Sequence, residues 1–335
     1  MAFLSPTAIR TRWPSTGTGS SWAIEPVPQP AGALQTILYG VSCASATSCT
    51  AVGTYYPQPI PGRGYQPLAE HWDGTRWTIQ PTPIPAGSPQ AQLYGVSCAS
   101  AASCTAAGFY YVGAGGNSGP LAEHWNGTRW AIQHVPLPPL ASEAQLEGVS
   151  CPTASDCTAV GPYSQLNPNT GLFAAHWDGI RWTAQVLPHP AGSSFLLLAV
   201  SCWQPGRCAA VGGAFNGNGQ PATSVVERQT GTSWTLRQDA APAHTTLYGV
   251  ACPSAQSCTA VGGDVLAWPP PSPGTTVAEY WDGTSWALQA APPPPGVYGA
   301  AMSGVSCLAP AYCTAVGSYV TTGSHIGQPL AEHEA

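Results

Sequence analysis

An all-β fold of six repeated sheets is predicted by three observations: the composition, six evenly spaced cysteine pairs, and a tryptophan motif that recurs with them. The chain has 335 residues, of which 38 are Gly and 36 are Pro. Because these two residues are the poorest helix formers, the composition excludes most helical folds. The 44% of hydrophobic residues and the 13 Trp supply enough apolar surface for a large core, which excludes a disordered chain.

The twelve cysteines form six C-x5-C pairs whose first members lie 50 to 55 residues apart. The pairs are Cys43 with Cys49, Cys98 with Cys104, Cys151 with Cys157, Cys202 with Cys208, Cys252 with Cys258 and Cys307 with Cys313. Most repeats read V-S-C at the first cysteine and C-T-A-V-G at the second. Since no cysteine is left over, we expect one structural disulfide per repeat and an oxidising compartment. Zinc is the alternative, but each pair would have to borrow two ligands from a neighbouring repeat.

The second motif, W-D-G-x-x-W, predicts a tight hairpin because Gly supplies the positive φ that such turns require. It begins at Trp72, Trp125, Trp177 and Trp281, and it degenerates at Gly231 to Trp234. In the first repeat the turn residues separate four expected strands, at Leu38 to Cys43, Cys49 to Tyr56, Pro67 to Trp72 and Arg76 to Gln80. Four strands in about 50 residues, repeated six times, predict a six-bladed β-propeller.

The two ends of the chain predict how the last blade is completed. Gln328 to His333 copies Gln66 to His71 and then stops, whereas Gly19 to Trp22 matches the outer strand that is missing there. We therefore expect the N-terminal strand to close the last blade, residues 19–335 to form one domain, and residues 1–18 to form an extension. In the alternative, Ala8 to Trp13 is a remnant strand and the chain is a piece of a longer array.

These motifs resemble the repeats of secreted bacterial β-propeller proteins, from Gly19 to His333. The W-D-G-x-x-W hairpin is also similar to the outer hairpin of six-bladed fucose-binding lectins and, more loosely, to the Asp-box of sialidases. The resemblance implies an extracellular protein, although no leader is visible between Met1 and Trp13. The resemblance to the lectins is weaker at their sugar-binding site, because the first strand of each repeat contains no Arg. A glutamate recurs one residue out of register, at Glu70, Glu123, Glu227, Glu279 and Glu332.

Charge and motifs exclude several function classes. The nine basic residues are all Arg and the net charge is -6, so the basic stripe that nucleic-acid binding requires is missing. No apolar stretch approaches the roughly 18 residues of a membrane span. The sequence contains no G-x-S-x-G, H-E-x-x-H or Gly-rich phosphate motif, so no cofactor is expected. His71, His124, His176 and His333 share one phase of the repeat, which places them on separate blades and predicts no metal centre.

The candidate ligand-binding residues lie in the long connections between the second and third strands, because these vary most from repeat to repeat. Aromatic rings stack on the apolar faces of sugars and amides bond their hydroxyl groups, which makes such loops suited to a glycan. The candidates are Arg63, Tyr65, Asn117, Tyr163, Asn169, Phe215, Asn216, Trp268 and His325. The structural alternative is that these are ordinary polar loops. The repeated Trp and Asp residues are expected to serve packing and turn formation.

Three function hypotheses follow. The first is a secreted, monomeric, non-enzymatic module that recognises extracellular or cell-wall glycans through the variable loops or the blade interfaces. The second is a scaffold for an extracellular protein ligand. The third is a glycan hydrolase or lyase, with Glu147 as the candidate catalytic acid, because it replaces the Tyr found at positions 39, 94 and 248. Glycosidases generally use two carboxylates, and Asp239 and Asp264 are the candidate partners.

Overall fold

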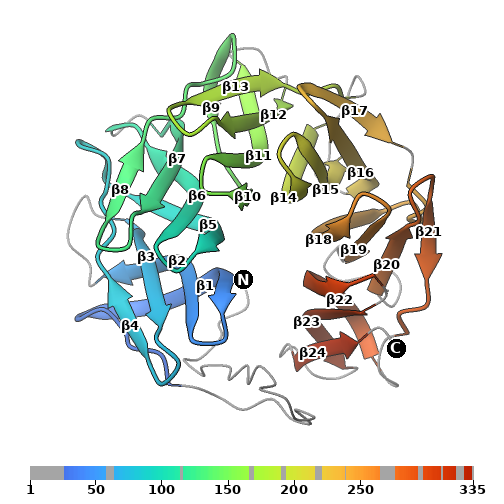
Figure 1. Cartoon of the computed structure of the whole chain (residues 1–335), viewed down its shortest axis with the longest axis horizontal. Coiled ribbons are helices and arrows are strands. Elements are labelled where there is room, and N and C mark those ends of the chain that lie inside the picture. Colours follow the sequence, from blue (N-terminus) through green and yellow to red (C-terminus); the bar gives the residue numbers. More distant parts are fainter. Residues whose placement is uncertain are drawn as a thin grey trace. The chain divides into compact units, whose positions relative to one another are not determined.

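The fold is a six-bladed β-propeller of antiparallel sheets, as the computed structural model shows (Figure 1). It describes residues 26–57, 64–113, 116–165, 170–189, 194–215, 221–237, 239–264, 276–292, 297–310, 312–321 and 328–333. Within these ranges no helix is long and apolar enough to cross a membrane. The chain divides into two compact units: unit 1 is Met1–Leu137, Glu143–Cys157 and Trp177–Thr183, and unit 2 is Pro138–Ser142, Thr158–His176 and Ala184–Ala335.

We call each sheet a blade and number the blades in chain order. Blade 1 contains β1 (Ala33–Ser45), β2 (Ser48–Pro57), β3 (Gln66–Trp72) and β4 (Trp77–Gln80), and blade 2 contains β5 (Ala91–Ser100), β6 (Ser103–Tyr111), β7 (Ser118–Trp125) and β8 (Trp130–Gln133). Blade 3 contains β9 (Ala141–Ala144), β10 (Gly148–Thr153), β11 (Asp156–Gln165), β12 (Thr170–Trp177) and β13 (Trp182–Val186). The first three strands of blade 1 extend beyond those expected, because the sequence motifs mark only part of each strand, whereas the fourth begins one residue later, at Trp77.

The remaining blades belong to unit 2. Blade 4 contains β14 (Ser194–Gln204), β15 (Arg207–Phe215), β16 (Pro221–Thr230) and β17 (Ser233–Arg237), and blade 5 contains β18 (Thr245–Ser254), β19 (Ser257–Asp264), β20 (Thr276–Trp281) and β21 (Trp286–Gln289). Blade 6 contains β22 (Val297–Ala309), β23 (Tyr312–Thr321) and β24 (Gln328–His333). The strand expected to close blade 6 lies at residues 19–25, outside the described residues. That closure and the proposed domain limits stay predictions.

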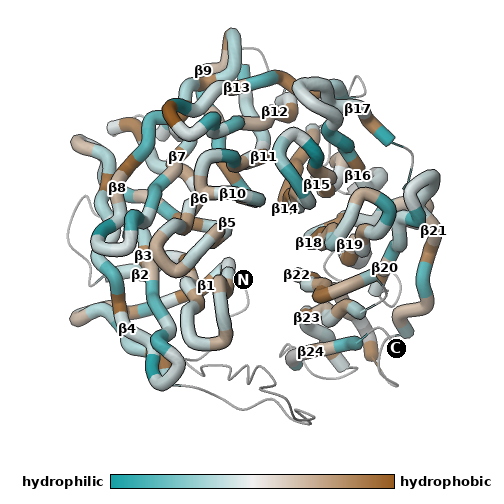
Figure 2. Tube along the Cα trace, viewed as in Figure 1, coloured by the Kyte–Doolittle hydropathy of each residue, from teal (hydrophilic) through white to brown (hydrophobic). Residues whose placement is uncertain are grey.

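Each blade has an apolar interior formed mainly by its first three strands. Figure 2 shows β14 and β15 coloured largely hydrophobic, whereas the end of β17 is hydrophilic. In the core of unit 2, Phe195 and Leu197 of β14 are buried and pack with Leu172 of β12 and Trp234 of β17. Burial of such side chains stabilises the fold by about 1.5–3 kcal/mol for each large residue.

A β-bulge in the first strand explains the Gly of the C-T-A-V-G motif. In blade 2 the register between β5 and β6 shifts between Leu93 and Gly95, which leaves Tyr94 in the bulge. The strands approach so closely here that a Cβ on Gly108 would overlap the carbonyl oxygen of Gln92 and lie 2.9 Å from Leu93 Cα. The corresponding glycines of four other blades meet the same obstacle, at Gly53, Gly212, Gly262 and Gly317. In blade 3 the first strand is instead interrupted between β9 and β10.

All six expected disulfides are present, one per blade, and the described residues include no free cysteine. The second cysteine of each pair lies near the start of an inner strand and is buried, which agrees with a structural role. These buried cysteines are Cys49, Cys104, Cys157, Cys208, Cys258 and Cys313. The prediction of one structural disulfide per repeat is therefore confirmed, and the zinc alternative is wrong.

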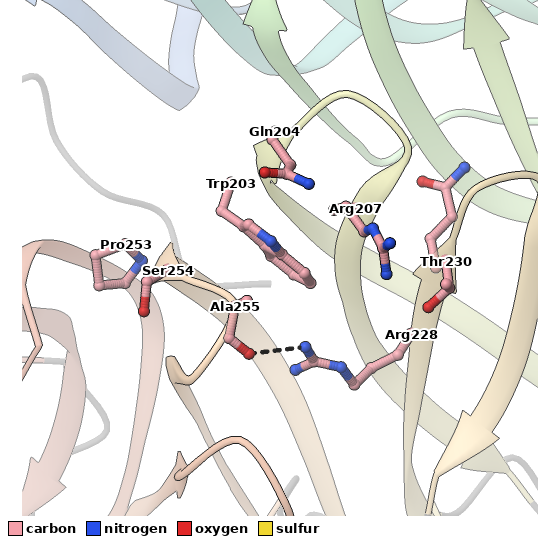
Figure 3. Close-up of a pocket in the computed structure, with 9 residues that line it drawn as sticks. Trp203, Gln204, Arg207, Arg228, Thr230, Pro253, Ser254 and Ala255 are labelled. Atoms are coloured by element: carbon pink, nitrogen blue, oxygen red, sulfur yellow. Dashed lines mark hydrogen bonds between the residues drawn. The ribbon is translucent and has the colours of Figure 1, made fainter.

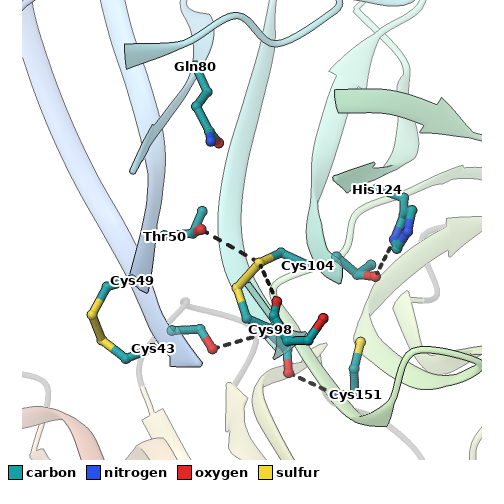
Figure 4. The surroundings of a disulfide bond; sticks show 12 residues. Cys43, Cys49, Thr50, Gln80, Cys98, Cys104, His124 and Cys151 are labelled. Carbon is teal, nitrogen blue, oxygen red and sulfur yellow. Dashed lines mark hydrogen bonds between the residues drawn. A yellow bond between two sulfur atoms is a disulfide. The ribbon is translucent and has the colours of Figure 1, made fainter. Parts of the chain in front are cut away.

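The cysteine motifs also join adjacent blades within each unit (Figure 4). Cys98 N donates to Ser42 Oγ at 3.0 Å. Thr50 Oγ1 lies 3.6 Å from Cys104 Sγ and is the donor of this pair, because a disulfide sulfur carries no proton. The same threonine contact recurs in unit 2, where Cys208 accepts from Thr158 at 3.7 Å and Cys313 accepts from Thr259 at 3.3 Å. The V-S-C and C-T-A-V-G motifs therefore specify docking as well as cross-linking.

The outer strands add a further contact between blades. Trp130 Nε1 of β8 donates to Gln80 Oε1 of β4 at 2.8 Å. The next pair repeats it, since Trp182 Nε1 of β13 donates to Gln133 Oε1 of β8, also at 2.8 Å. In blades 2 and 3 the second Trp of the W-D-G-x-x-W motif is thus a packing residue with a satisfied N–H, whereas Trp286 Nε1 of blade 5 is buried and forms no hydrogen bond with the described residues.

The W-D-G-x-x-W segment forms the expected turn. In blade 2, Asn126 Oδ1 accepts hydrogen bonds from the backbone N–H groups of Thr128 and Arg129, both at 3.0 Å. Gly127 has φ of +90°, and a Cβ on it would lie 3.1 Å from Ala102 of the neighbouring turn. The two turns of a blade thus lie on the same side, which we call the turn face. The connections that hold the candidate loop residues leave from the opposite end of the strands.

Replacing Asn126 with Ala is expected to lower the free energy of unfolding by about 1 kcal/mol, because two backbone donors lose their acceptor. Asn126→Asp keeps the acceptor that three other blades already use, so it should leave stability near that of the wild type. Urea unfolding of the oxidised proteins measures both. Equal loss in both variants would contradict the role assigned to the side-chain oxygen.

Candidate functional site

Four of the predicted loop residues fall within the described part of the chain. The ring of Tyr65 lies 5.3 Å from that of Tyr56, and the carbonyl of Asn117 accepts a hydrogen bond from Val112 N at 2.8 Å. Tyr163 is buried and packs against Phe173, with 6.4 Å between ring centroids. Phe215 is half-buried at the end of β15. Arg63, Asn169, Asn216, Trp268 and His325 lie outside the described residues, so this loop site stays a prediction.

Glu147 lies in unit 1, in the interruption between β9 and β10. Burial raises the pKa of its carboxyl to about 7. The pKa of Tyr94 is raised as well, first by burial and then by the charge of Glu147. The ring of Tyr94 contacts Tyr39, with centroids 5.0 Å apart. Glu147 is therefore a weakly acidic group beside aromatic rings, and its catalytic role stays a hypothesis.

The proposed carboxylate partners of Glu147 lie in unit 2. Asp264 ends β19, and Asp239 lies near Glu279, since the charge of Asp239 adds to burial in raising the pKa of Glu279 to about 8. Glu279 Oε1 accepts a hydrogen bond from Ala240 N at 3.1 Å. Asp239 thus has a carboxyl neighbour of its own, within the same unit.

Four of the five recurring glutamates are buried, at Glu70, Glu123, Glu227 and Glu279, whereas Glu332 is half-buried. Glu70, Glu123 and Glu227 are 0% exposed, and their carboxyl oxygens accept no hydrogen bond from the described residues. Burial raises the pKa of each to about 8, so the protonated form predominates at neutral pH. A group closed off from the surface does not contact a sugar, so the similarity in position to the lectin glutamate carries no shared role here.

Blade 4 departs from the motifs of the other blades at several neighbouring positions. Trp203 follows the first cysteine, where the other blades have Ala, Pro or Leu. Ala209 replaces the Thr that bonds the next disulfide, and Arg228 and Gln229 replace the His and Trp seen at the end of β3. The strand pairing also extends one step beyond Gln229 and Trp234, to Thr230 and Ser233, so the turn between these strands is tighter. These substitutions gather on the turn face of unit 2.

A cavity of about 420 Å³ opens where these residues meet the next blade (Figure 3). We call it the Trp203 pocket, and it is lined by Trp203, Gln204, Arg207, Arg228, Gln229, Thr230, Pro253, Ser254 and Ala255. The turn between β14 and β15, the end of β16 and the turn between β18 and β19 supply these residues. Since all of them belong to unit 2, one compact unit holds the complete site.

Arg228 forms the inner wall of the pocket and is held from several sides. Its guanidinium carbon lies 4.8 Å from the ring centroid of Trp203 and 4.3 Å from that of Trp281. Nη2 donates to the carbonyl of Ala255 at 3.1 Å, as Figure 3 shows. Nη1 donates to Cys258 Sγ at 3.8 Å, which replaces the threonine contact of the other blades. Burial, and then the charge of Arg237, lower the pKa of Arg228 to about 10, so it stays protonated at neutral pH.

Arg207 differs from Arg228 because it is exposed. Among the described residues, nothing forms a hydrogen bond or an ion pair with its guanidinium. Glu227 and Glu279 are buried and Asp239 is half-buried, and burial raises the pKa of all three carboxyls. The mouth of the Trp203 pocket is therefore positively charged, although the whole chain carries a net charge of -6.

The lining of the pocket combines apolar and hydrogen-bonding groups. An indole ring and a proline supply apolar surface, while two amides, two hydroxyls and two guanidiniums supply hydrogen bonds. None of the nine lining residues carries a carboxylate, an imidazole or a thiol, which are the usual acid, base and nucleophile groups. Among the described residues, no group of three His, Cys, Asp or Glu side chains could hold a metal ion.

The sequence predictions missed the Trp203 pocket, because they placed the variable residues only in the long loops on the opposite side. Two signals pointed to it. Trp203 and Arg207 are the bulky residues of a C-x5-C loop that is small and polar in blade 1, and the tryptophan motif degenerates in the same repeat. The sequence does not show that the bulky C-x5-C loop and the degenerate tryptophan motif lie side by side, because that depends on how the turns pack.

Comparisons with known proteins support the fold and give no family. No protein-family model matches the chain, and no curated protein matches it. A protein of unknown function from Dyadobacter fermentans has a TM-score of 0.60 at 10% identity, covering 91% of this chain and 99% of that one. An ulvan lyase bound to GlcA(1-4)Rha3S has a TM-score of 0.58 at 8% identity, covering 91% and 79%. The Hadza microbial sialidase Hz136 has a TM-score of 0.56 at 9% identity; this chain is covered to 90% and spans 66% of that enzyme.

Proposed function

We propose that this protein is a secreted, non-enzymatic glycan-binding module and that the Trp203 pocket is a saccharide site. The observation that carries the proposal is the placement of the pocket where blade 4 departs from the repeat. If the substitutions in blade 4 served only to pack it against blade 5, we would expect them to fill this space and not to leave a cavity. A tryptophan ring beside amide and hydroxyl groups is the combination that sugars require, since they present apolar faces and many hydroxyls.

Size and location agree with this function. A cavity of about 420 Å³ falls within the range of small-molecule sites and would accommodate a short saccharide. The six disulfides favour an oxidising, extracellular setting, where such ligands occur. The similar structures include enzymes named for glycans, although a likeness at 8–9% identity supports only the fold.

Trp203→Ala is expected to weaken saccharide binding at least about tenfold, because the loss of a stacked ring removes on the order of 1–2 kcal/mol of binding free energy. Trp203→Phe keeps a ring and should bind with intermediate affinity. Leu308 occupies the matching position of blade 6 and is 65% exposed, so Leu308→Ala serves as the control and should bind normally.

The measurement is a glycan array with the oxidised wild type, followed by titration of the best saccharide against the three variants. Competition by free sugar should abolish the signal, and heat-unfolded protein should give none. If the folded wild type binds no saccharide, or if Leu308→Ala reduces binding as much as Trp203→Ala, the proposal fails. The protein-scaffold hypothesis would then take its place.

A further inference from the structure

We propose that the Trp203 pocket selects saccharides that carry a negative charge, as a carboxylate or a sulfate, and that Arg207 binds this group. This inference rests on the proposed function and names the class of its ligand. It also gives a role to the one charged side chain of the pocket that forms no hydrogen bond or ion pair with the described residues.

The first argument concerns Arg207. An exposed arginine on a net acidic protein commonly pairs with a nearby carboxylate, as Arg76 does with Asp73 at 3.7 Å in blade 1. Arg207 has no such partner among the described residues, yet it lies at the edge of a cavity. Its planar guanidinium can give two parallel hydrogen bonds to a carboxylate or to a sulfate, which makes an anion the best partner.

The second argument concerns Arg228, which adds a second positive charge at the pocket wall. Its contacts with two indole rings and with the carbonyl of Ala255 fix it in place. A cation that is already ordered loses little conformational entropy when a ligand binds. A neutral sugar would leave both positive charges uncompensated, whereas an anionic sugar would neutralise them.

The third argument concerns the rest of the lining, which favours a sugar over an acidic peptide. Gln204, Thr230 and Ser254 present neutral hydrogen-bonding groups, and apolar surface is limited to a ring and two small residues. Peptide recognition depends on larger apolar anchors or on an exposed sheet edge, and neither lines this cavity. An acidic sugar matches both the charge and the hydroxyl-rich surroundings.

The test compares charged and neutral forms of the same saccharide. Oligogalacturonate is titrated beside its methyl ester, which keeps the ring and removes the charge, and dextran sulfate is titrated beside dextran of equal length. A wild type that binds at least one charged form about tenfold or more tightly than its neutral form supports the inference, and the pair that shows the difference tells carboxylate from sulfate. The preference should weaken as the salt concentration rises.

Arg207→Gln should remove this preference, so that charged and neutral forms bind alike. Arg129→Gln is the matched control, because Arg129 is also an exposed arginine on the turn face, in blade 2. If the neutral forms bind the wild type as tightly as the charged ones while Trp203→Ala still abolishes binding, the anion inference is wrong and the proposed function stands. If only a polyglutamate peptide binds, and Arg207→Gln releases it, both are overturned.

Discussion

Gly108→Ala is expected to be among the most damaging single substitutions in this protein, lowering the free energy of unfolding by more than about 3 kcal/mol. The added methyl group would overlap the carbonyl oxygen of Gln92 and lie 2.9 Å from both the carbonyl carbon of Gln92 and the Cα of Leu93. All three atoms belong to the backbone of β5, so no side chain can rotate away. Relief would require the two inner strands of blade 2 to separate at the bulge.

Gly304→Ala provides the control, because a Cβ at Gly304 would meet only Val316 Cγ2, at 3.9 Å. It should change stability by less than about 1 kcal/mol. Thermal and urea unfolding of both oxidised variants, together with the yield of soluble protein, measure the difference. Comparable stability of the two variants would refute the close approach of the strands as the reason for the Gly of the C-T-A-V-G motif.

Acidic conditions are expected to stabilise the fold, so that the melting temperature falls as the pH rises from 5 to 8. Burial raises the pKa of Glu70, Glu123, Glu227 and Glu279 from 4.5 to about 8. Between these values the folded chain keeps protons that the unfolded chain has released. Each such proton lowers the free energy of unfolding by about 1.4 kcal/mol per pH unit, and the effect is complete above pH 8. His124, whose pKa is lowered by burial, acts in the opposite sense.

Glu123→Gln isolates one of these groups, because glutamine does not ionise. Relative to the wild type, the variant should become progressively more stable between pH 5 and pH 8, with a slope that is shallower by about one proton. Parallel profiles for Glu123→Gln and the wild type would show that Glu123 ionises normally in the folded protein.

The sequence predicts the blade architecture well because each blade repeats its own evidence. The C-x5-C spacing, the Asp-Gly turn and the paired Trp residues each act over a few residues, so local chemistry is enough to place the hairpins and the disulfides. The interruption of the first strand in blade 3 was not predicted, since Glu147 differs from its counterparts by one side chain. Within this interruption, Leu146 N donates a hydrogen bond to Gly108 O of blade 2 at 3.1 Å, a contact between residues that are far apart in the sequence.

The candidate site could not be predicted in the same way. Trp203, Arg228 and Ala255 are spread over about 50 residues of sequence. The pairing of strands within blade 4 brings the first two together, and the packing of blade 4 against blade 5 adds the third. The burial of the recurring glutamates is equally hard to predict from the sequence, because a glutamate in a strand of alternating residues can face either the interior or the solvent. The repeat suggests that Glu70 and Glu123 have a shared role, but their complete enclosure follows from the neighbouring chain.

The hydrogen bonds between blades give the repeat a direction. Within each unit, the Ser of one V-S-C motif accepts from the backbone N–H of the next first cysteine, as in Ser42 with Cys98, Ser97 with Cys151 and Ser201 with Cys252. Blades 1, 2 and 4 thus present this acceptor to the blade that follows, like monomers in a head-to-tail polymer, whereas blade 5 has Ala251 at the serine position. Any repeat that keeps these atoms can follow any other, so a turn can acquire a new pocket while the docking atoms remain unchanged.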